Sequence, residues 1–144
     1  EALASQAARL GIKLHLTGPV TAAQRESLLA ESDLFVQPSL SIHGRREGTP
    51  LAVLEALAAG VPVIATSTGG LISLGEDAGV RLVPPEDAES LSRCIRELLE
   101  NSDQREHMSR THRDFGERVT WTQLGPRHRD ALLESQNRFR CALP

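Results

Sequence analysis

Two carboxylates and a predicted helix start are the residues best suited to chemistry, and all of them lie within residues 46–70. Glu47 precedes a predicted helix over residues 50–59, and Glu55 lies inside that helix. Every other residue from 51 to 59 is apolar, so nearly every face of the helix is expected to be buried. A buried carboxylate is costly unless a group donates hydrogen bonds to it. Glu55 therefore needs a partner, which is either a ligand or another part of the protein.

The start of this helix has the residue types of an anion site. Thr49 is expected to be the N-cap, and Pro50 suits the first helical position because its missing N–H would be unpaired there in any case. The free amides of Leu51 and Ala52 would then point out of the helix together with the positive end of its dipole. Such an arrangement suits a phosphate or diphosphate. The alternative is a well-capped helix that binds nothing.

The two acids extend this interpretation from a phosphate to a nucleotide sugar. Glu47 and Glu55 flank the helix start, and carboxylates accept hydrogen bonds well from vicinal hydroxyls. Their spacing is too wide for two acids that share a proton, and it lacks a His or Asp partner that would suggest a metal. A phosphate on the amides with hydroxyls on the acids describes a nucleotide sugar. The alternative for Glu55 is a structural acid paired with an arginine.

Composition excludes several other classes of function. The 144 residues are enough for one domain, and only 3% are aromatic, which argues against stacking on single-stranded nucleic acid. Basic residues outnumber acidic ones in 101–144, which we interpret as a solvated helical face. Cys94 and Cys141 have no metal or redox spacing, which favours a reducing compartment. No apolar run is long enough to span a bilayer and no signal peptide is evident, so a soluble, cytoplasmic chain is expected.

Alternating helix and strand patterns place these residues in an α/β fold. The predicted helices cover 1–10, 22–30, 50–59, 87–100, 104–115 and 121–139 (the last broken at Gly125-Pro126), and the predicted strands cover 12–16, 33–37, 61–65 and 79–83. This order predicts a Rossmann-like, doubly wound parallel sheet with C-terminal helices. Ligands of such sheets bind beyond the carboxyl ends of the strands, where the loop 38–49 is expected to lie.

The same stretch carries a family resemblance. Residues 46–70, REGTPLAVLEALAAGVPVIATSTGG, resemble the signature of the family-4 glycosyltransferases, which are retaining enzymes of the GT-B fold. The flanking segments 15–20, 32–39 and 83–87 match in the same order, so the resemblance covers roughly residues 10–100, and Trp121 fits the aromatic residue before the family's C-terminal helix. Gly48-Thr49-Pro50 stands where Gly-Phe-Gly is common, a variant typical of exopolysaccharide-type members.

The resemblance implies a role for each matching position. Glu47 would be catalytic and approach the hydroxyls of the transferred sugar, and Glu55 would bind the ribose hydroxyls of the donor. Gly18 and Val20 would lie near the base. Sugar and diphosphate would be held by the backbone of four consecutive residues, Gly48, Thr49, Pro50 and Leu51. Such enzymes need neither a metal nor another cofactor, since the leaving diphosphate is stabilised by positive groups and the helix end.

The resemblance also implies how the domain is organised. Residues 1–118 would form the C-terminal, donor-binding domain of a GT-B enzyme without its first strand, and residues 119–144 its C-terminal helical segment. The full-length parent would move a hexose from a nucleotide diphosphate sugar to a saccharide or lipid-linked acceptor, which an absent N-terminal domain would hold. The fragment alone would be inactive. The parent would be cytoplasmic, or peripheral at the inner face of the membrane, and would bind no nucleic acid.

Three alternatives remain open at the level of sequence. A nucleotide-sugar epimerase of the same fold would need further catalytic acids and a histidine from another domain. A sugar-nucleotide binding module without chemistry would show no transfer even with the upstream domain restored. A plain interaction domain would bind no nucleotide at all.

Overall fold

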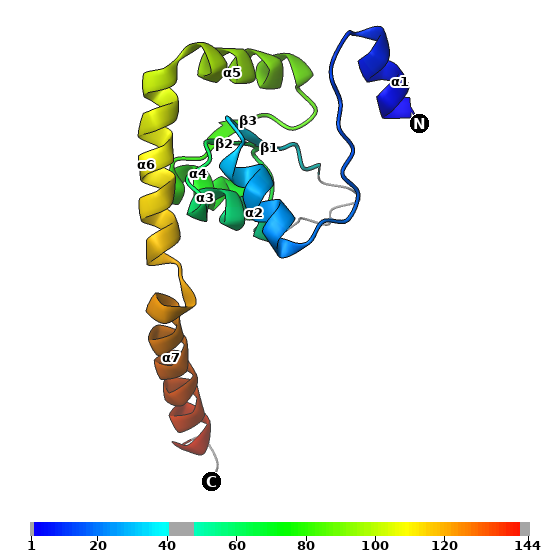
Figure 1. Ribbon diagram of the computed structural model, residues 1–144. Helices are drawn as coiled ribbons and strands as arrows, with labels where there is room; N and C mark the ends of the chain where they lie inside the picture. The colour runs from blue at the N-terminus through cyan, green and yellow to red at the C-terminus, as the bar shows by residue number, and fades with distance from the viewer. Residues whose placement is uncertain (1, 41–47, 142–144) are drawn as a thin grey trace.

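The computed structural model describes the backbone of residues 2–40 and 48–141, and the side chains of these residues apart from 121 and 135–141. In this part of the chain a small parallel sheet lies between layers of helices (Figure 1). The elements are α1 (Ala2–Arg9), α2 (Ala22–Ala30), β1 (Phe35–Gln37), α3 (Leu51–Ala58), β2 (Val63–Thr66), α4 (Leu71–Ala78), β3 (Arg81–Val83), α5 (Ala88–Glu100), α6 (Ser102–Arg118) and α7 (Trp121–Cys141).

The three strands lie side by side in chain order and are all parallel. Val36 pairs with Ile64, and Ala65 pairs with Leu82, so the strands are in close register. All four residues of β2 are buried, as expected for the central strand of a sheet covered on both faces. The carboxyl ends of the three strands therefore lie at one edge, and the loops that follow them meet there.

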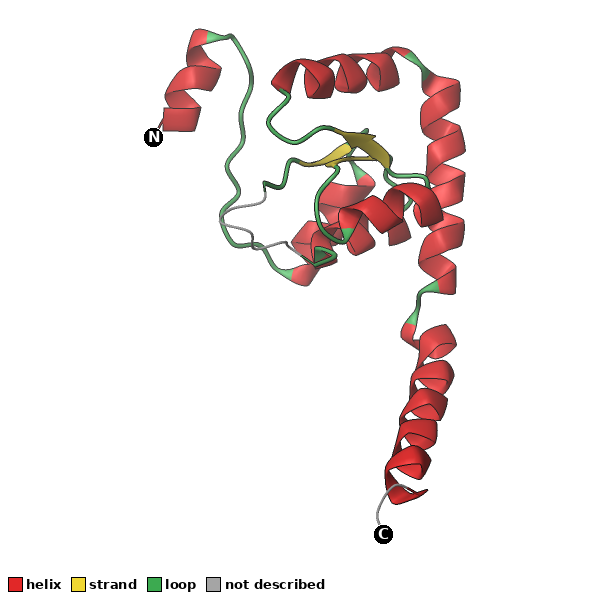
Figure 2. Ribbon diagram, turned by 180° about the vertical axis from the view of Figure 1, so that it is seen from behind, coloured by secondary structure: helices red, strands yellow, loops and turns green. Residues whose placement is uncertain are grey.

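Side chains of β2 alternate between two hydrophobic cores, because successive residues of a strand point to opposite faces. Val63 and Ala65 belong to the core beneath α3 and α4, whereas Ile64 belongs to the core beneath α5. Helix α2 adds Leu29 to the first core. Helix α6 packs against α3, α4 and α5 and so closes one side of both layers (Figures 1 and 2). This confirms the predicted α/β fold with helices on both faces of a parallel sheet.

His112 fixes α6 to the sheet and is completely buried. Its Nδ1 lies 2.9 Å from the carbonyl oxygen of Val61, just before β2, and its Nε2 lies 3.4 Å from that of Gly79, just before β3. Both carbonyl oxygens can only accept, so the imidazole N–H donates to one of them. The interpretation of residues 101–144 as a solvated face is therefore wrong for His112. Its ring occupies the amino-terminal edge of the sheet, away from the edge predicted to bind ligands.

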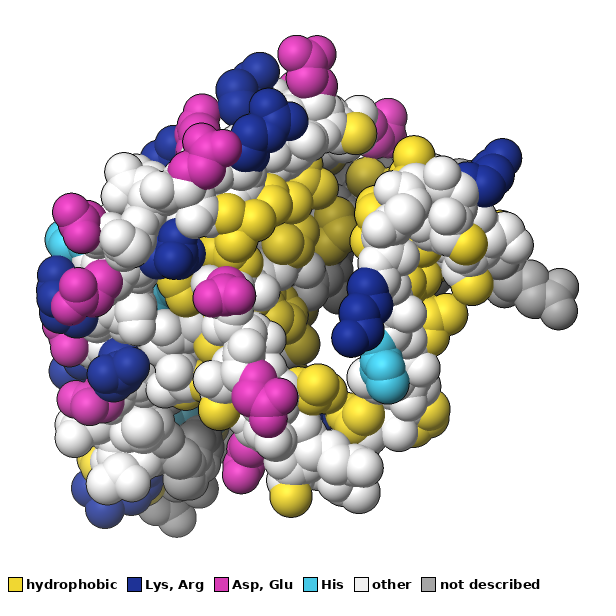
Figure 3. Space-filling model, turned by 45° about the horizontal axis from the view of Figure 1, so that its top comes forward, with side chains coloured by type: hydrophobic (Ala, Val, Ile, Leu, Met, Phe, Trp, Pro, Cys, Tyr) yellow, Lys and Arg dark blue, Asp and Glu magenta, His cyan; other side chains and the backbone are white. Residues whose placement is uncertain are grey.

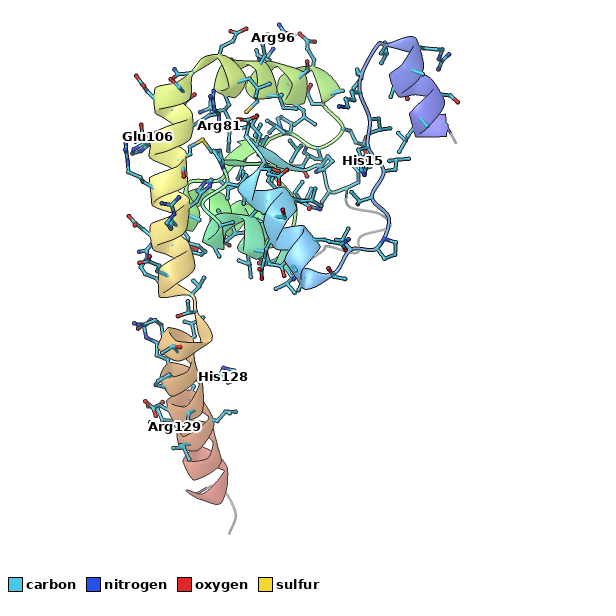
Figure 4. The ribbon with its side chains drawn as sticks, viewed as in Figure 1. His15, Arg81, Arg96, Glu106, His128 and Arg129 are labelled. Carbon is cyan, nitrogen blue, oxygen red and sulfur yellow. The ribbon has the colours of Figure 1, made fainter. Side chains whose placement is uncertain are left out.

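Polar contacts hold α5 over the face of the sheet opposite to α3 and α4. Asp87 caps the helix by accepting hydrogen bonds from the backbone N–H (2.9 Å) and hydroxyl (2.7 Å) of Ser90, and these bonds lower the pKa of the Asp87 carboxyl. Arg81 of β3 pairs with Glu97 of α5 at 3.4 Å, and Figure 4 shows Arg81 lying between the sheet and α5. Cys94 is buried beneath the helix, and this burial raises the pKa of its thiol.

The strand predicted over 12–16 is wrong in this structure. Residues 12–20 run from α1 to α2 without pairing to any described strand. A strand pattern becomes a strand only when a neighbour supplies the hydrogen bonds of the ladder. The alternating apolar side chains of this segment remain largely exposed: Ile12 58%, Leu14 45% and Leu16 62%.

Two further elements differ from the prediction. Helix α4 (Leu71–Ala78) was not predicted, because Gly75, Glu76 and Asp77 interrupt its apolar pattern. Helix α7 runs continuously through Pro126, where a break was expected. Proline removes one intrahelical hydrogen bond, and the exposed backbone of a helix that projects from the body can bond to water instead. None of the helices in the described ranges is both long and apolar enough to cross a membrane.

Gly60 follows α3 in a left-handed conformation. Its φ is +72°, and the two closing hydrogen bonds of a Schellman motif follow it: Gly60 N–H to Leu57 O and Val61 N–H to Ala56 O, each 2.9 Å. We expect Gly60→Val to lower the free energy of unfolding by about 2 kcal/mol, because a β-branched residue is strained at this φ. Thermal denaturation beside Gly60→Asn, which tolerates the conformation, measures the effect. A valine variant that melts like the wild type would contradict it.

Candidate functional site

The candidate site lies at the carboxyl edge of the sheet, where α3 and α4 begin. Both helices start close to the ends of strands, and the turn at Gly69-Gly70 leads directly into α4. A Cβ atom added to Gly70 would lie 2.7 Å from Thr49 Oγ1 and 2.9 Å from Thr49 N. The glycine turn and the loop that precedes α3 therefore touch. The structure thus brings together the two ends of the stretch that the sequence singled out.

Helix α3 begins one residue later than predicted. Pro50, with φ −62° and ψ 131°, is the N-cap, and its carbonyl accepts from Val53 N–H at 3.1 Å. The prediction of Thr49 as N-cap and Pro50 as the first helical residue is therefore wrong, and no side chain caps the helix. The φ of Pro50 would suit a helix, but its ψ of 131° is extended, so the helix starts after Pro50. Leu51 and Ala52 remain the first helical residues, whose amides have no acceptor within the helix.

Threonine side chains shape the neighbouring loops. Thr66, the last residue of β2, donates its hydroxyl to Ser39 O at 2.6 Å and so fixes the loop that follows β1. Thr68, two residues before Gly70, is buried, and its Oγ1 has no hydrogen-bond partner among the described residues. A buried hydroxyl without a partner costs free energy that a ligand or water can recover. Sequence reasoning missed Thr68, because threonine at the end of a strand is ordinary.

Glu55 is paired with an arginine, one of the two partners considered from sequence. Arg25 Nε of α2 lies 2.9 Å from Glu55 Oε2 of α3, with side-chain exposures of 42% and 25% respectively. The pair is thus half-buried, at a cavity of about 460 Å³ between the two helices. Sequence spacing gave no signal for Arg25, because 30 residues separate it from Glu55.

Gly18 and Val20 lie on the other side of α2 from Glu55. Gly18 has φ +62° in the extended segment that leads to α2. Val20 lines a cavity of about 330 Å³ together with His15, which Figure 4 shows on that segment, and Gln24 of α2. The cavity beside Glu55 is lined instead by Arg25 and other residues of α2 and α3. The structure therefore does not bring Val20 and Glu55 into one cavity.

Glu47 lies outside the described residues, as do His43, Arg45 and Arg46 of the same loop. Its catalytic role therefore stays a prediction. Within the described part of the chain, no group of three His, Cys, Asp or Glu residues is placed to hold a metal ion. Because the loop that contains Glu47 lies outside the described residues, the expected independence from metal also stays a prediction.

A further cavity of about 270 Å³ opens at the same edge of the sheet. It is lined by residues that follow all three strands and by the first turns of α5: Pro38, Leu40, Thr66, Pro84, Glu86, Asp87, Ala88 and Leu91. Figure 3 shows apolar side chains gathered in a hollow below α5. The carboxyl edge is thus concave, as expected where a parallel sheet binds its ligand.

Comparisons with known proteins agree with this arrangement. The chain is 42% identical over 80 residues to TuaC of Bacillus subtilis, named as a teichuronic acid biosynthesis glycosyltransferase; these are 56% of this chain and 19% of that protein. It is 31% identical over 115 residues to the sulfoquinovosyl transferase SQD2 of Arabidopsis thaliana, which are 77% of this chain and 22% of that protein. The chain thus spans about a fifth of the length of each relative.

A solved structure shares the fold. Sucrose-phosphate synthase of Thermosynechococcus elongatus matches 92% of this chain and 34% of its own chain with a TM-score of 0.73, at 22% sequence identity. The family model described as glycosyl transferases group 1 matches residues 1–115, most of the chain. The parallel sheet, the helix start beside a glycine turn and these matches lead to one conclusion: the chain belongs to the glycosyl transferases group 1 family.

Proposed function

We propose that this chain is the donor-binding part of a retaining glycosyltransferase of family 4, which transfers a hexose from a nucleotide diphosphate sugar. Residues 1–118 are the donor-binding domain and residues 119–144 its C-terminal helical segment. The backbone from Gly48 to Leu51 binds the sugar and diphosphate, and Glu55 binds the ribose. Glu47 approaches the sugar hydroxyls. Gly18 and Val20 are left out of the proposed base site, because Val20 and Glu55 line separate cavities. No metal or other cofactor takes part.

One observation carries the proposal: the start of α3 lies against the glycine turn before α4. Gly70 has no side chain, and a Cβ there would lie 2.9 Å from Thr49 N and 3.0 Å from Gly48 C. The missing side chain at Gly70 therefore lets the glycine turn and the backbone at the head of α3 pack directly against each other. The unpaired amides at this end and the helix dipole favour a diphosphate. The buried hydroxyl of Thr68 is a further donor close to this turn in sequence.

Exposed apolar groups support the proposal that the domain lacks a strand. β1 is an edge strand that pairs only with β2 among the described strands. Leu34 and Val36 pack only partly against the core beneath α5, while Ile12, Leu14 and Leu16 are exposed on an unpaired segment. A parallel strand added beside β1 would cover Leu34 and Val36. It would also give the segment that carries the exposed apolar residues a neighbouring strand. The donor-binding domain would be complete only with that addition.

The acceptor and the compartment are proposed from the relatives. TuaC is named for teichuronic acid biosynthesis, which suggests a saccharide or lipid-linked acceptor in a polysaccharide pathway. The acceptor would be held by a further domain of the parent protein, so the present chain alone would not catalyse transfer. The parent would work in the cytoplasm or at the inner face of the membrane.

Calorimetric titration with UDP, GDP and ADP at low salt and without metal tests the proposal. We expect one of the three to bind the complete parent protein, and the 144-residue chain to bind the same nucleotide more weakly. A complete protein that binds none of them would overturn the proposal. Binding that is lost after chelation of divalent metal would overturn its metal-independent form.

A further inference from the structure

We propose that Arg25 is a positioning residue for donor binding, which holds the Glu55 carboxylate in the orientation that receives the ribose hydroxyls. This inference rests on the proposed function, because it assumes that Glu55 binds those hydroxyls. Arg25 itself would act through Glu55 and not by contact with the reacting sugar.

The geometry of the pair leaves Glu55 able to bind a ligand. Arg25 donates from Nε to Oε2 of Glu55 at 2.9 Å. A carboxylate offers two oxygens and about four acceptor positions, so one bond to Oε2 leaves those of Oε1 for vicinal hydroxyls. The bond also selects one orientation of a side chain that otherwise rotates about three bonds. Fixing that orientation in advance lowers the entropy lost when the ligand binds.

Glu55 lies on a helix that packs into the core, and Arg25 lies near the capped start of a helix at its edge. Arg25 follows a capping box in which Thr21 Oγ1 accepts from Gln24 N–H (3.3 Å) and Gln24 Oε1 accepts from Thr21 N–H (2.9 Å). Helix α2 has no buried residue and meets the core through the partly buried Leu29. Helix α3 is anchored by three fully buried residues: Val53, Ala56 and Leu57. Side chains on anchored helices hold a ligand group more accurately than side chains on loops.

The pair also differs from the ion pairs on the surface of this protein. Arg93–Glu89 and Arg110–Glu106 each join residues four apart on one helix, and their side chains are mostly exposed. Such pairs contribute little because water screens them. Arg25–Glu55 joins two helices, and Glu55 is three-quarters buried. The cavity beside it is also lined by the partly buried Leu29 and by three exposed alanines, Ala30, Ala58 and Ala59.

Charge gives a second reason for an arginine here. Glu26 of α2 lines the same cavity as Glu55, so two carboxylates face one space. Without a cation, their repulsion would favour orientations of Glu55 that point away from Glu26. Arg25 offsets this repulsion. Replacing Arg25 is therefore expected to reduce the preference for ribose over dideoxyribose without unfolding the protein.

The test compares ribose with dideoxyribose in the complete parent protein. Affinities for UDP, GDP and ADP are measured by calorimetry beside those for their 2′,3′-dideoxy counterparts, in the wild type, Arg25→Gln, Arg25→Lys and Glu55→Gln. We expect the wild type to prefer the ribose form of its nucleotide by about tenfold, and Glu55→Gln to lose that preference. Arg25→Gln is expected to lose most of it, with unchanged affinity for the dideoxy form. Arg25→Lys should recover part, because it restores the charge without the Nε geometry.

Arg110→Gln is the matched control, since it removes an arginine from the exposed pair with Glu106 at 2.6 Å. The Arg110→Gln variant should keep the full preference for the ribose form of the nucleotide. If the wild type shows no preference for ribose, the role of Glu55 fails and the proposed function with it. If the wild type and Glu55→Gln behave as expected but Arg25→Gln keeps the preference, only the inference about Arg25 is overturned. Equal losses of both nucleotide forms in Arg25→Gln would also overturn it, because they indicate a merely structural role.

Discussion

Glu55→Gln is expected to weaken binding of the preferred nucleoside diphosphate by about ten- to one-hundredfold. The substitution keeps the volume of the side chain and removes the negative charge that receives the ribose hydroxyls. Hydrogen bonds to a charged group contribute about 1.5–3 kcal/mol, which corresponds to this range of affinity. Glu55 is three-quarters buried, so water replaces the lost acceptor only in part. Calorimetry on the complete parent protein gives the two dissociation constants directly.

The fold should survive the same change. Glu55 contacts Arg25 at the surface of the cavity and takes no part in the two hydrophobic cores, so the melting temperature is expected to fall little. Glu106→Gln on α6, which loses a comparable pair with Arg110, is the control and should bind like the wild type. Equal affinity of Glu55→Gln and wild type would refute the role of Glu55. A collapse of the melting temperature would instead make Glu55 a structural acid.

Gly116→Ala is expected to destabilise the protein by about 2 kcal/mol, although alanine favours helices by about 1 kcal/mol over glycine. Gly116 is the position at which α6 crosses α3. A Cβ added there would lie 2.6 Å from Ala58 Cα and 3.2 Å from Ala58 N. These are backbone atoms, so relief requires that one helix move away from the other. Denaturant unfolding, followed by the signal of the helices, measures the change in free energy.

Gly75→Ala is the matched comparison inside α4. The nearest neighbour of an added Cβ at Gly75 is the Leu82 side chain, and the closest backbone atom, Val80 O, is 3.6 Å away. A leucine side chain can change rotamer at modest cost. Gly75→Ala should therefore be close to neutral, with the gain in helix propensity offsetting the adjustment of Leu82. If Gly116→Ala were as stable as Gly75→Ala, the close packing of α6 on α3 would not hold.

The sequence predicted the elements whose signals are local. The helices predicted over 22–30, 50–59 and 87–100 each depend on a few neighbouring residues, and α2, α3 and α5 agree with them to within one residue at each end. The prediction failed where an element depends on distant partners. The segment 12–16 has the alternation of a strand, but a strand forms only beside another strand. α4 was missed because its apolar residues are too few without the sheet beneath them.

The candidate site divides in the same way. Residue types and order were enough to single out residues 46–70 and Glu55, because an acid in an apolar helix is conspicuous in any fold. Sequence could not reveal that Gly70 touches Thr49 or that Arg25 pairs with Glu55. Each of these contacts joins segments brought together by the parallel sheet and the helices packed on it. Residue types and their spacing along the chain indicate which chemistry is possible, whereas the crossover connections of a parallel sheet decide which residues come into contact.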